Sequence, residues 1–81
     1  MRQNELRGKI LTFLHHVYPR QVDETAIVGV LYEYHPVDEI LRALEYLTDK
    51  ALIARDSRPH PYRERKTVAL YRICPAGVDL V

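Results

Sequence analysis

The chain of 81 residues is poor in cysteine and has no long apolar run. Its one cysteine, Cys74, excludes an intramolecular disulfide and a zinc site built from four cysteines, and it fits a reducing compartment. No apolar run approaches the ~18 residues needed to cross a bilayer. The stretch from Met1 to Lys9 is polar and charged, unlike a signal peptide. These absences predict a soluble, cytoplasmic protein.

The usual signatures of catalysis and metal binding are also missing. The three glycines are scattered, so no glycine-rich loop is available to hold a phosphate. His15 and His16 are adjacent and point about 100° apart on a helix. His35 and His60 lie in separate turns, and no His-x3-His or His-Glu-x-x-His pattern occurs. We therefore expect a domain that works by binding, with no enzyme activity, no cofactor and no metal.

The apolar spacing predicts one domain, spanning residues 1–81, that is mainly α with a small β-hairpin. The elements are expected at residues 5–18, 24–34 and 37–50 for the helices, 52–57 and 67–73 for the strands, and 75–81 for a short C-terminal turn. Asn4 and Asp23 are the expected N-caps of the first two helices. The fold class is therefore α+β.

Two details of the predicted helices concern their packing. The third helix carries an apolar stripe that we expect to face the core, formed by Val37, Ile40, Leu41, Leu44 and Leu47. Gly29 lies inside the second helix, where glycine costs about 1 kcal/mol relative to alanine. Its presence there predicts the close approach of a neighbouring helix.

The net charge of +1 conceals an uneven distribution along the chain. Residues 21–51 carry seven acids against two basic residues, a net charge of −5. Residues 52–72 carry five arginines and one lysine against two acids, a net charge of +4. The chain therefore has an acidic middle and a basic hairpin, and these two regions are expected to meet different partners.

Three stretches resemble the winged helix-turn-helix family. Residues 46–53 (Tyr-Leu-Thr-Asp-Lys-Ala-Leu-Ile) resemble the end of a recognition helix that runs into the first wing strand. Residues 70–77 (Leu-Tyr-Arg-Ile-Cys-Pro-Ala-Gly) resemble the second wing strand and the Thr-Pro-x-Gly turn after it, and residues 22–31 are similar to the helix before the recognition helix. The resemblance implies a three-helix fold with a two-stranded wing and a role in DNA binding and transcription regulation.

A narrower resemblance concerns residues 72–79 together with residues 46–50, which are similar to small winged-helix proteins of Mu-like prophages. Two positions depart from the wider family pattern. Ala51 stands where glycine is usual, because the residue after the helix turns left-handed, and we expect Ala51→Gly to stabilise the domain. Cys74 stands where threonine is usual, and a thiol caps a helix less well than a hydroxyl.

The third helix usually enters the major groove in this family. Here its outer positions carry four acids, at 38, 39, 45 and 49, and each of them opposes DNA. We therefore expect duplex DNA to be contacted mainly by the wing, with Arg42 and Tyr46 as the only major-groove candidates. The predicted DNA-binding residues are Arg42, Tyr46, Arg55, Arg58, Arg63, Arg65 and Lys66. The alternative is a solvated loop whose basic residues prevent edge-to-edge aggregation.

A second functional hypothesis is a protein-interaction module that keeps the fold but not the groove contacts. The acidic third helix would then meet a basic partner through Glu39 and Glu45. Leu11 and Tyr18 flank the apolar stripe of the first helix, and they form either a homodimer surface or a surface that the C-terminal element covers.

Overall fold

The computed structural model describes residues 2–81, with side chains described from Asn4 onward. In chain order the elements are α1 (Arg2–His16), β1 (Val22–Asp23), α2 (Glu24–Leu31), α3 (Val37–Asp49), β2 (Ile53–Pro59), β3 (Thr67–Ile73) and α4 (Pro75–Leu80). Over these residues the fold is α+β, with four helices and a three-stranded antiparallel sheet in the order β1-β3-β2. The expected fold class is confirmed.

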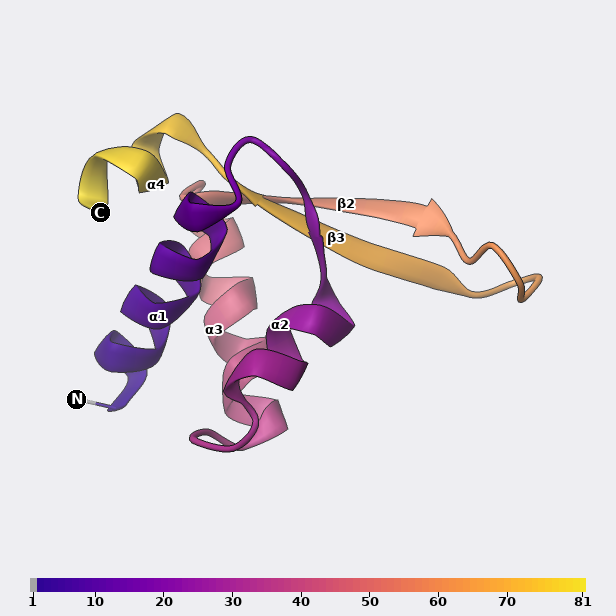
Figure 1. The fold of residues 1–81 in the computed structure, drawn as a ribbon, viewed down its shortest axis with the longest axis horizontal. Helices are drawn as coiled ribbons and strands as arrows, with labels where there is room; N and C mark the ends of the chain where they lie inside the picture. The colour runs from indigo at the N-terminus through magenta and orange to yellow at the C-terminus, as the bar shows by residue number, and fades with distance from the viewer. Residues whose placement is uncertain (1) are drawn as a thin grey trace.

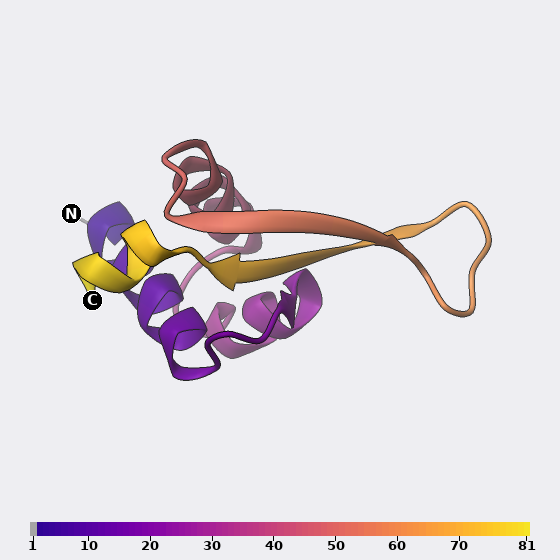
Figure 2. The same cartoon turned by 90° about the horizontal axis from the view of Figure 1, so that it is seen from above.

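The helices gather at one end of the molecule, and the hairpin of β2 and β3 projects away from them (Figure 1). Seen from above, the two strands twist around each other and end in an open loop far from every helix (Figure 2). The principal extents are 39 × 27 × 21 Å, so the hairpin makes the molecule markedly elongated. None of the helices in residues 2–81 is long and apolar enough to cross a membrane.

The core lies where α1, α2 and α3 meet the near end of the hairpin. Its largest fully buried side chains are Leu6, Ile10, Leu14, Ile27, Ile40, Leu44, Leu47, Ile53 and Ile73. Burying an aliphatic side chain of this size contributes about 1.5–3 kcal/mol relative to leaving it in water. The strands therefore belong to the core only at their near end.

Several predicted boundaries were wrong by a few residues. α1 begins at Arg2, so Asn4 lies inside the helix and is not its N-cap. α2 ends at Leu31 because the backbone N–H groups of Tyr34 and His35 both donate to the Leu31 carbonyl, closing a turn before Pro36. α3 ends one residue earlier than predicted, and β2 starts one residue later and runs two residues further.

The expectation of a two-stranded hairpin alone was wrong, because a third strand joins it. Val22 and Asp23 pair with Tyr71 and Leu70 of β3. A strand of two residues is too short to leave an alternating pattern in the sequence. The cap at Asp23 was predicted correctly: its side chain accepts a hydrogen bond of 2.6 Å from the backbone N–H of Thr25.

The end of α3 has the left-handed residue that the family pattern predicts. Ala51 has a φ of 59°, and the N–H of Leu52 donates to the Leu47 carbonyl while that of Ala51 donates to the Thr48 carbonyl. These two bonds form a Schellman motif, in which glycine is the residue usually found at the left-handed position. Ala51 is therefore strained.

The prediction for Gly29 was wrong, and Gly77 is the glycine at a close approach. A Cβ atom added to Gly29 would have no neighbour within 4 Å. A Cβ atom at Gly77 would overlap the Leu52 carbonyl oxygen and lie 2.8 Å from Cγ1 of Ile73. Gly77 therefore lets α4 pack closely against the chain that links α3 to β2.

The apolar stripe of α3 is rotated relative to the prediction. Val37 and Leu41 are exposed, and Ala43 is buried together with Ile40 and Leu44. Ala43 is fully buried although it was not part of the predicted stripe. The rotation brings Leu41 to the edge of the space between α3 and the hairpin.

Candidate nucleic-acid interface

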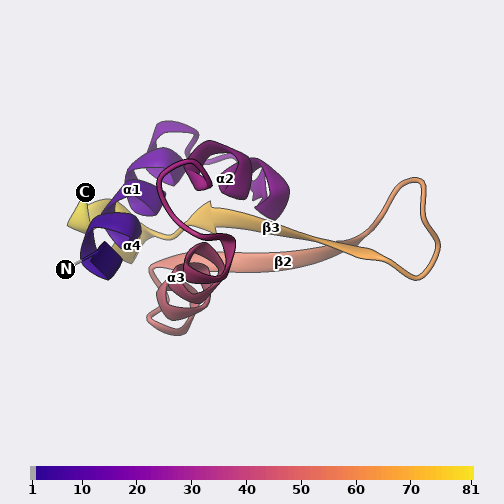
Figure 3. The ribbon, with the colours of Figure 1, turned by 90° about the horizontal axis from the view of Figure 1, so that it is seen from below.

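The outer part of the hairpin, residues 56–67, is here called the distal hairpin. Every residue in it is exposed except His60, which is half-buried. It carries four basic residues, Arg58, Arg63, Arg65 and Lys66, against Asp56 and Glu64. The loop lies at the end of the molecule opposite the N- and C-termini (Figure 3). The distal hairpin is therefore a projecting element with a positive charge.

The loop of the distal hairpin is closed by its own hydrogen bonds. The N–H of His60 donates to the Lys66 carbonyl at 2.8 Å, and the N–H of Tyr62 donates to Nδ1 of His60 at 3.1 Å. Arg65 adopts a left-handed φ of 70°, which turns the chain back toward β3. These contacts give the loop a defined shape although it packs on no helix.

The four basic residues of the distal hairpin differ in how much of their charge is already compensated. Arg58 lies 3.5 Å from Oδ2 of Asp56 and donates to Oε1 of Gln21 at 3.2 Å, so it is anchored to the base of the hairpin. Within residues 2–81, no ion pair joins Arg63, Arg65 or Lys66 to an acid. The charge available to a partner is therefore concentrated in the loop.

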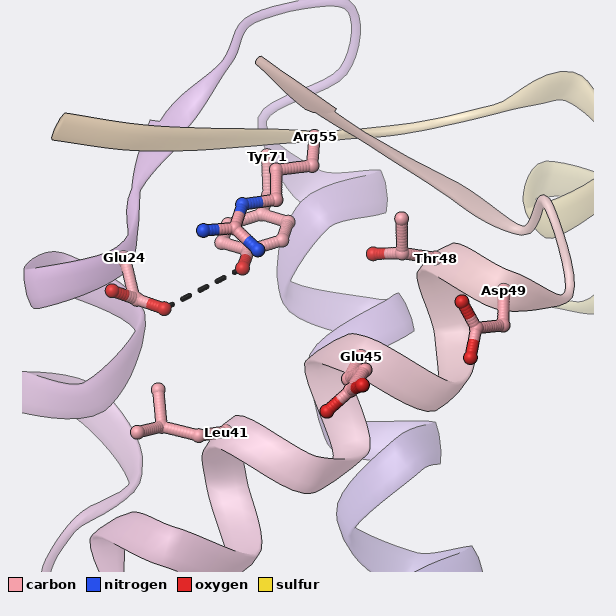
Figure 4. A pocket seen from close by; sticks show the side chains of 7 residues that line it. All are labelled: Glu24, Leu41, Glu45, Thr48, Asp49, Arg55 and Tyr71. Atoms are coloured by element: carbon pink, nitrogen blue, oxygen red, sulfur yellow. Dashed lines mark hydrogen bonds between the residues drawn. The ribbon is translucent and has the colours of Figure 1, made fainter. Parts of the chain in front are cut away.

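A second surface lies beneath the near end of the hairpin and is here called the acidic hollow. It has a volume of about 400 Å³, and its lining residues are Glu24, Leu41, Glu45, Thr48, Asp49, Arg55 and Tyr71. The three carboxylates come from α2 and α3, and Arg55 reaches down from β2 between them (Figure 4). The hollow therefore holds three acids and one basic residue.

Tyr71 forms the inner wall of the acidic hollow and is almost fully buried. Its hydroxyl donates a hydrogen bond of 3.4 Å to Oε1 of Glu24 (Figure 4). Burial raises the pKa of the Tyr71 hydroxyl, and the negative charge of Glu24 raises it further, while Arg55 acts in the opposite direction. Tyr71 is therefore held as a neutral donor.

A third cluster covers the flank of α3 that faces α1. The Arg7 guanidinium carbon lies 3.6 Å from the centroid of the Tyr46 ring, and Nζ of Lys50 lies 5.6 Å from the same centroid. Both distances are typical of cation–π contacts. Tyr46 is 38% exposed, but its ring is already engaged within the domain. Arg42 lies one helical turn before Tyr46 and is exposed.

The structure divides the predicted DNA-binding residues into three groups. Arg58, Arg63, Arg65 and Lys66 lie together on the distal hairpin. Arg55 lies instead in the acidic hollow, among the carboxylates. Arg42 and Tyr46 lie on α3, whose acids Glu45 and Asp49 line the hollow. The predicted DNA-binding residues therefore do not form one continuous positive surface, because carboxylates of the acidic hollow lie among them.

The predicted partner interface does not form one surface. Leu11 is only 7% exposed and belongs to the core, so its assignment as an interface residue was wrong. Helix α4 packs against α1, as the alternative interpretation of this flank had it. Tyr18 is exposed after the end of α1, Glu45 lines the hollow, and Glu39 is half-buried and lies outside the lining.

Sequence reasoning missed Glu24, Asp49 and Tyr71 as residues of one site. The alternation of Ala69, Tyr71 and Ile73 indicated that the Tyr71 side chain points inward. Nothing in the sequence indicated that Glu24 of α2 would meet it. Despite these acids, no group of three histidine, cysteine, aspartate or glutamate side chains in residues 2–81 is arranged to hold a metal ion.

Comparisons of this chain with protein-family models, curated proteins and solved structures found no match.

Proposed function

We propose that this chain is a winged helix-turn-helix domain that binds duplex DNA through its distal hairpin, as a module of transcription regulation. The order of three helices followed by a basic hairpin supports the fold assignment. The observation that carries the DNA-binding proposal is the projecting loop, where Arg63, Arg65 and Lys66 have no acidic partner within the described chain. DNA presents one negative charge per ~1.7 Å of its axis, so such a loop attracts it strongly.

The three loop residues would bind the DNA backbone or enter a narrow minor groove. Arginine on an extended loop is suited to both, since its guanidinium pairs with phosphate and is attracted to the negative potential of narrow minor grooves. The α3 helix would contribute little, because Glu45 and Asp49 repel phosphates on the side that faces the hairpin. Arg42 is the exposed basic residue of α3 that could add a contact at the edge.

A titration over salt tests this proposal. Fluorescence anisotropy of a labelled duplex should show binding at ~50 mM salt that weakens steeply toward ~200 mM. Each neutralised phosphate contributes about 0.9 to the slope of log K against log salt, so three loop contacts predict a slope near −2.7. Absence of binding to any duplex at ~50 mM salt would contradict the proposal.

A second candidate function is a protein interaction, and the acidic hollow is the observation that favours it. Three carboxylates around one arginine form a surface complementary to a basic element, and the distal hairpin of a second copy is such an element. This head-to-tail contact would produce a homodimer or a longer chain of copies. It competes with DNA for the same loop.

Sedimentation velocity at low salt tests the second candidate. The wild type should associate as its concentration rises, and a Glu45→Lys, Asp49→Lys double variant should remain monomeric. Glu33→Lys provides the control, because Glu33 is exposed but does not line the hollow. A wild type that is monomeric at every concentration would exclude this homotypic contact.

A further inference from the structure

Tyr62 is the most exposed large apolar side chain described in this protein, at 91%. It belongs to the loop that joins β2 to β3, and this loop lies at the far end of the hairpin (Figure 2). An aromatic ring of this kind buries 150–250 Å² when it finds a partner, so its full exposure leaves a large contact area unused. The four residues that follow it, Arg63 to Lys66, are all charged, so the ring is the one aromatic surface beside a mainly basic segment.

The loop presents this ring in a defined position. The N–H of Tyr62 is held by Nδ1 of His60, and the His60 and Tyr62 rings meet edge to face with centroids 6.3 Å apart. Pro59 and Pro61 flank His60 and restrict the backbone, since proline fixes φ near −65°. Less conformational freedom is therefore lost when the ring meets a partner.

Two of the four other exposed tyrosines in the described chain, Tyr34 and Tyr46, have a basic residue over the ring, whereas Tyr18 and Tyr32 lack one and lie outside the distal hairpin. Lys9 lies over the Tyr34 ring at 5.1 Å, and Arg7 lies over the Tyr46 ring at 3.6 Å. Within residues 2–81, no basic group lies over the face of Tyr62, although Arg63, Arg65 and Lys66 are its neighbours in the loop. Tyr62 therefore offers an open aromatic face surrounded by positive charge.

We propose that Tyr62 stacks on an exposed base of DNA while the loop cations hold the flanking phosphates. The preferred partner would then be DNA that contains an unpaired or unstacked base, such as a single-nucleotide bulge, rather than a fully paired duplex. Proteins that bind unpaired DNA combine a basic surface with aromatic rings on which bases stack. A well-stacked duplex offers no base face to such a ring unless a step is opened.

This inference rests on the proposed DNA-binding function, and the test separates the two. Two labelled duplexes are compared by anisotropy: one fully paired, and one with a single bulged 2-aminopurine, whose fluorescence reports stacking. The wild type should bind the bulged duplex more tightly and change the 2-aminopurine signal. Tyr62→Ala should weaken binding to the bulge about 5- to 150-fold, the equivalent of about 1–3 kcal/mol of stacking.

The control variants identify the chemistry. Tyr62→Phe keeps the ring and should retain the affinity and the 2-aminopurine signal, whereas Tyr62→Leu should behave like Tyr62→Ala. Affinity for the fully paired duplex should be the same in all three variants. Tyr62 is exposed, so none of these changes removes a core contact.

Each other result overturns a specific part of the proposal. If the wild type binds both duplexes equally, or if Tyr62→Ala binds the bulge as the wild type does, stacking by Tyr62 is wrong and DNA binding by the loop stands. If Tyr62→Ala loses both duplexes equally, the ring supports the loop and does not select a base. If the wild type binds neither, both proposals fail, and a protein partner becomes the better explanation of the exposed ring.

Discussion

The two ends of the hairpin obey different physical constraints. At the near end, Ile53, Tyr71 and Ile73 are buried against the helices. At the far end, every residue from Asp56 to Thr67 except His60 is exposed, and six of the eight charged residues of the hairpin are there. The strands are continuous across the boundary, with Ile53 paired to Ile73 and Pro59 paired to Thr67. One element therefore belongs to the core at one end and projects into solvent, where we propose that it binds DNA, at the other.

This contrast implies that stability and binding can be changed independently. Substitutions at the near end should lower the free energy of unfolding, because they remove packed apolar atoms. Substitutions in the distal hairpin should change binding and leave stability within about 0.5 kcal/mol, as is usual for exposed sites. The three variants below test the effect of near-end substitutions on the stability of the fold.

The largest effect is expected from Ile73→Ala. Ile73 is fully buried, and truncating a buried isoleucine costs about 2–5 kcal/mol. For a domain of this size the whole free energy of unfolding is on the order of 4–12 kcal/mol, so the variant should be largely destabilised. Urea unfolding followed by circular dichroism measures the change. The neighbouring exposed residue gives the control: Arg72→Ala should unfold like the wild type, and equal losses in both variants would contradict the contrast.

A smaller effect of opposite sign is expected from Ala51→Gly at the start of the hairpin. Ala51 holds a left-handed φ of 59°, which costs a residue with a Cβ atom roughly 1 kcal/mol relative to glycine. The melting temperature should rise by roughly 4–8 °C, and DNA affinity should not change. A melting temperature that stays the same or falls would show that the Schellman turn is not strained.

The smallest effect is expected from Tyr71→Phe and depends on pH. Burial and Glu24 hold the pKa of Tyr71 above its ordinary value of 10.0, so the unfolded chain loses this proton first as the pH rises. The contribution of the neutral Tyr71 hydroxyl to the free energy of unfolding is therefore fully present below pH 10. It is lost as the pH passes the pKa of Tyr71 in the folded state. Tyr71→Phe should abolish this alkaline loss, whereas Tyr62→Phe, at an exposed site, should retain it. Unfolding in urea at pH 8 and above pH 10 measures the difference, and identical pH profiles for the wild type and Tyr71→Phe would contradict it.

Local chemistry was the part of the fold that the sequence predicted well. The carboxylate of Asp23 caps α2 because capping depends on neighbouring residues alone, and the left-handed turn falls at Ala51, where the family resemblance placed it. The strand β1 was missed because two residues carry no periodic signal. The rotation of α3 was missed because the exposure of Leu41 depends on how the hairpin crosses the helix, which no local pattern determines.

The candidate site was predictable only where it is continuous in sequence. Arg63, Arg65 and Lys66 share one loop, so the sequence already places them together. The acidic hollow joins α2, α3, β2 and β3, and its charge appears only when Glu24 and Glu45 are brought to opposite sides of Arg55 (Figure 4). Leu11 was assigned to a partner because the elements that pack against α1, which are α3, β3 and α4, all follow it in the chain, and the spacing within α1 alone does not show which flank they cover.

The most direct test of the central claim measures stability and DNA affinity on one variant, Arg63→Ala, Arg65→Ala, Lys66→Ala. We expect the variant to unfold in urea within about 1 kcal/mol of the wild type, because all three side chains are exposed. The slope of log K for DNA binding against log salt should become less negative by about 2.7, since three phosphate contacts are lost. A variant that keeps the slope and affinity of the wild type would show that the distal hairpin is not the DNA-binding surface.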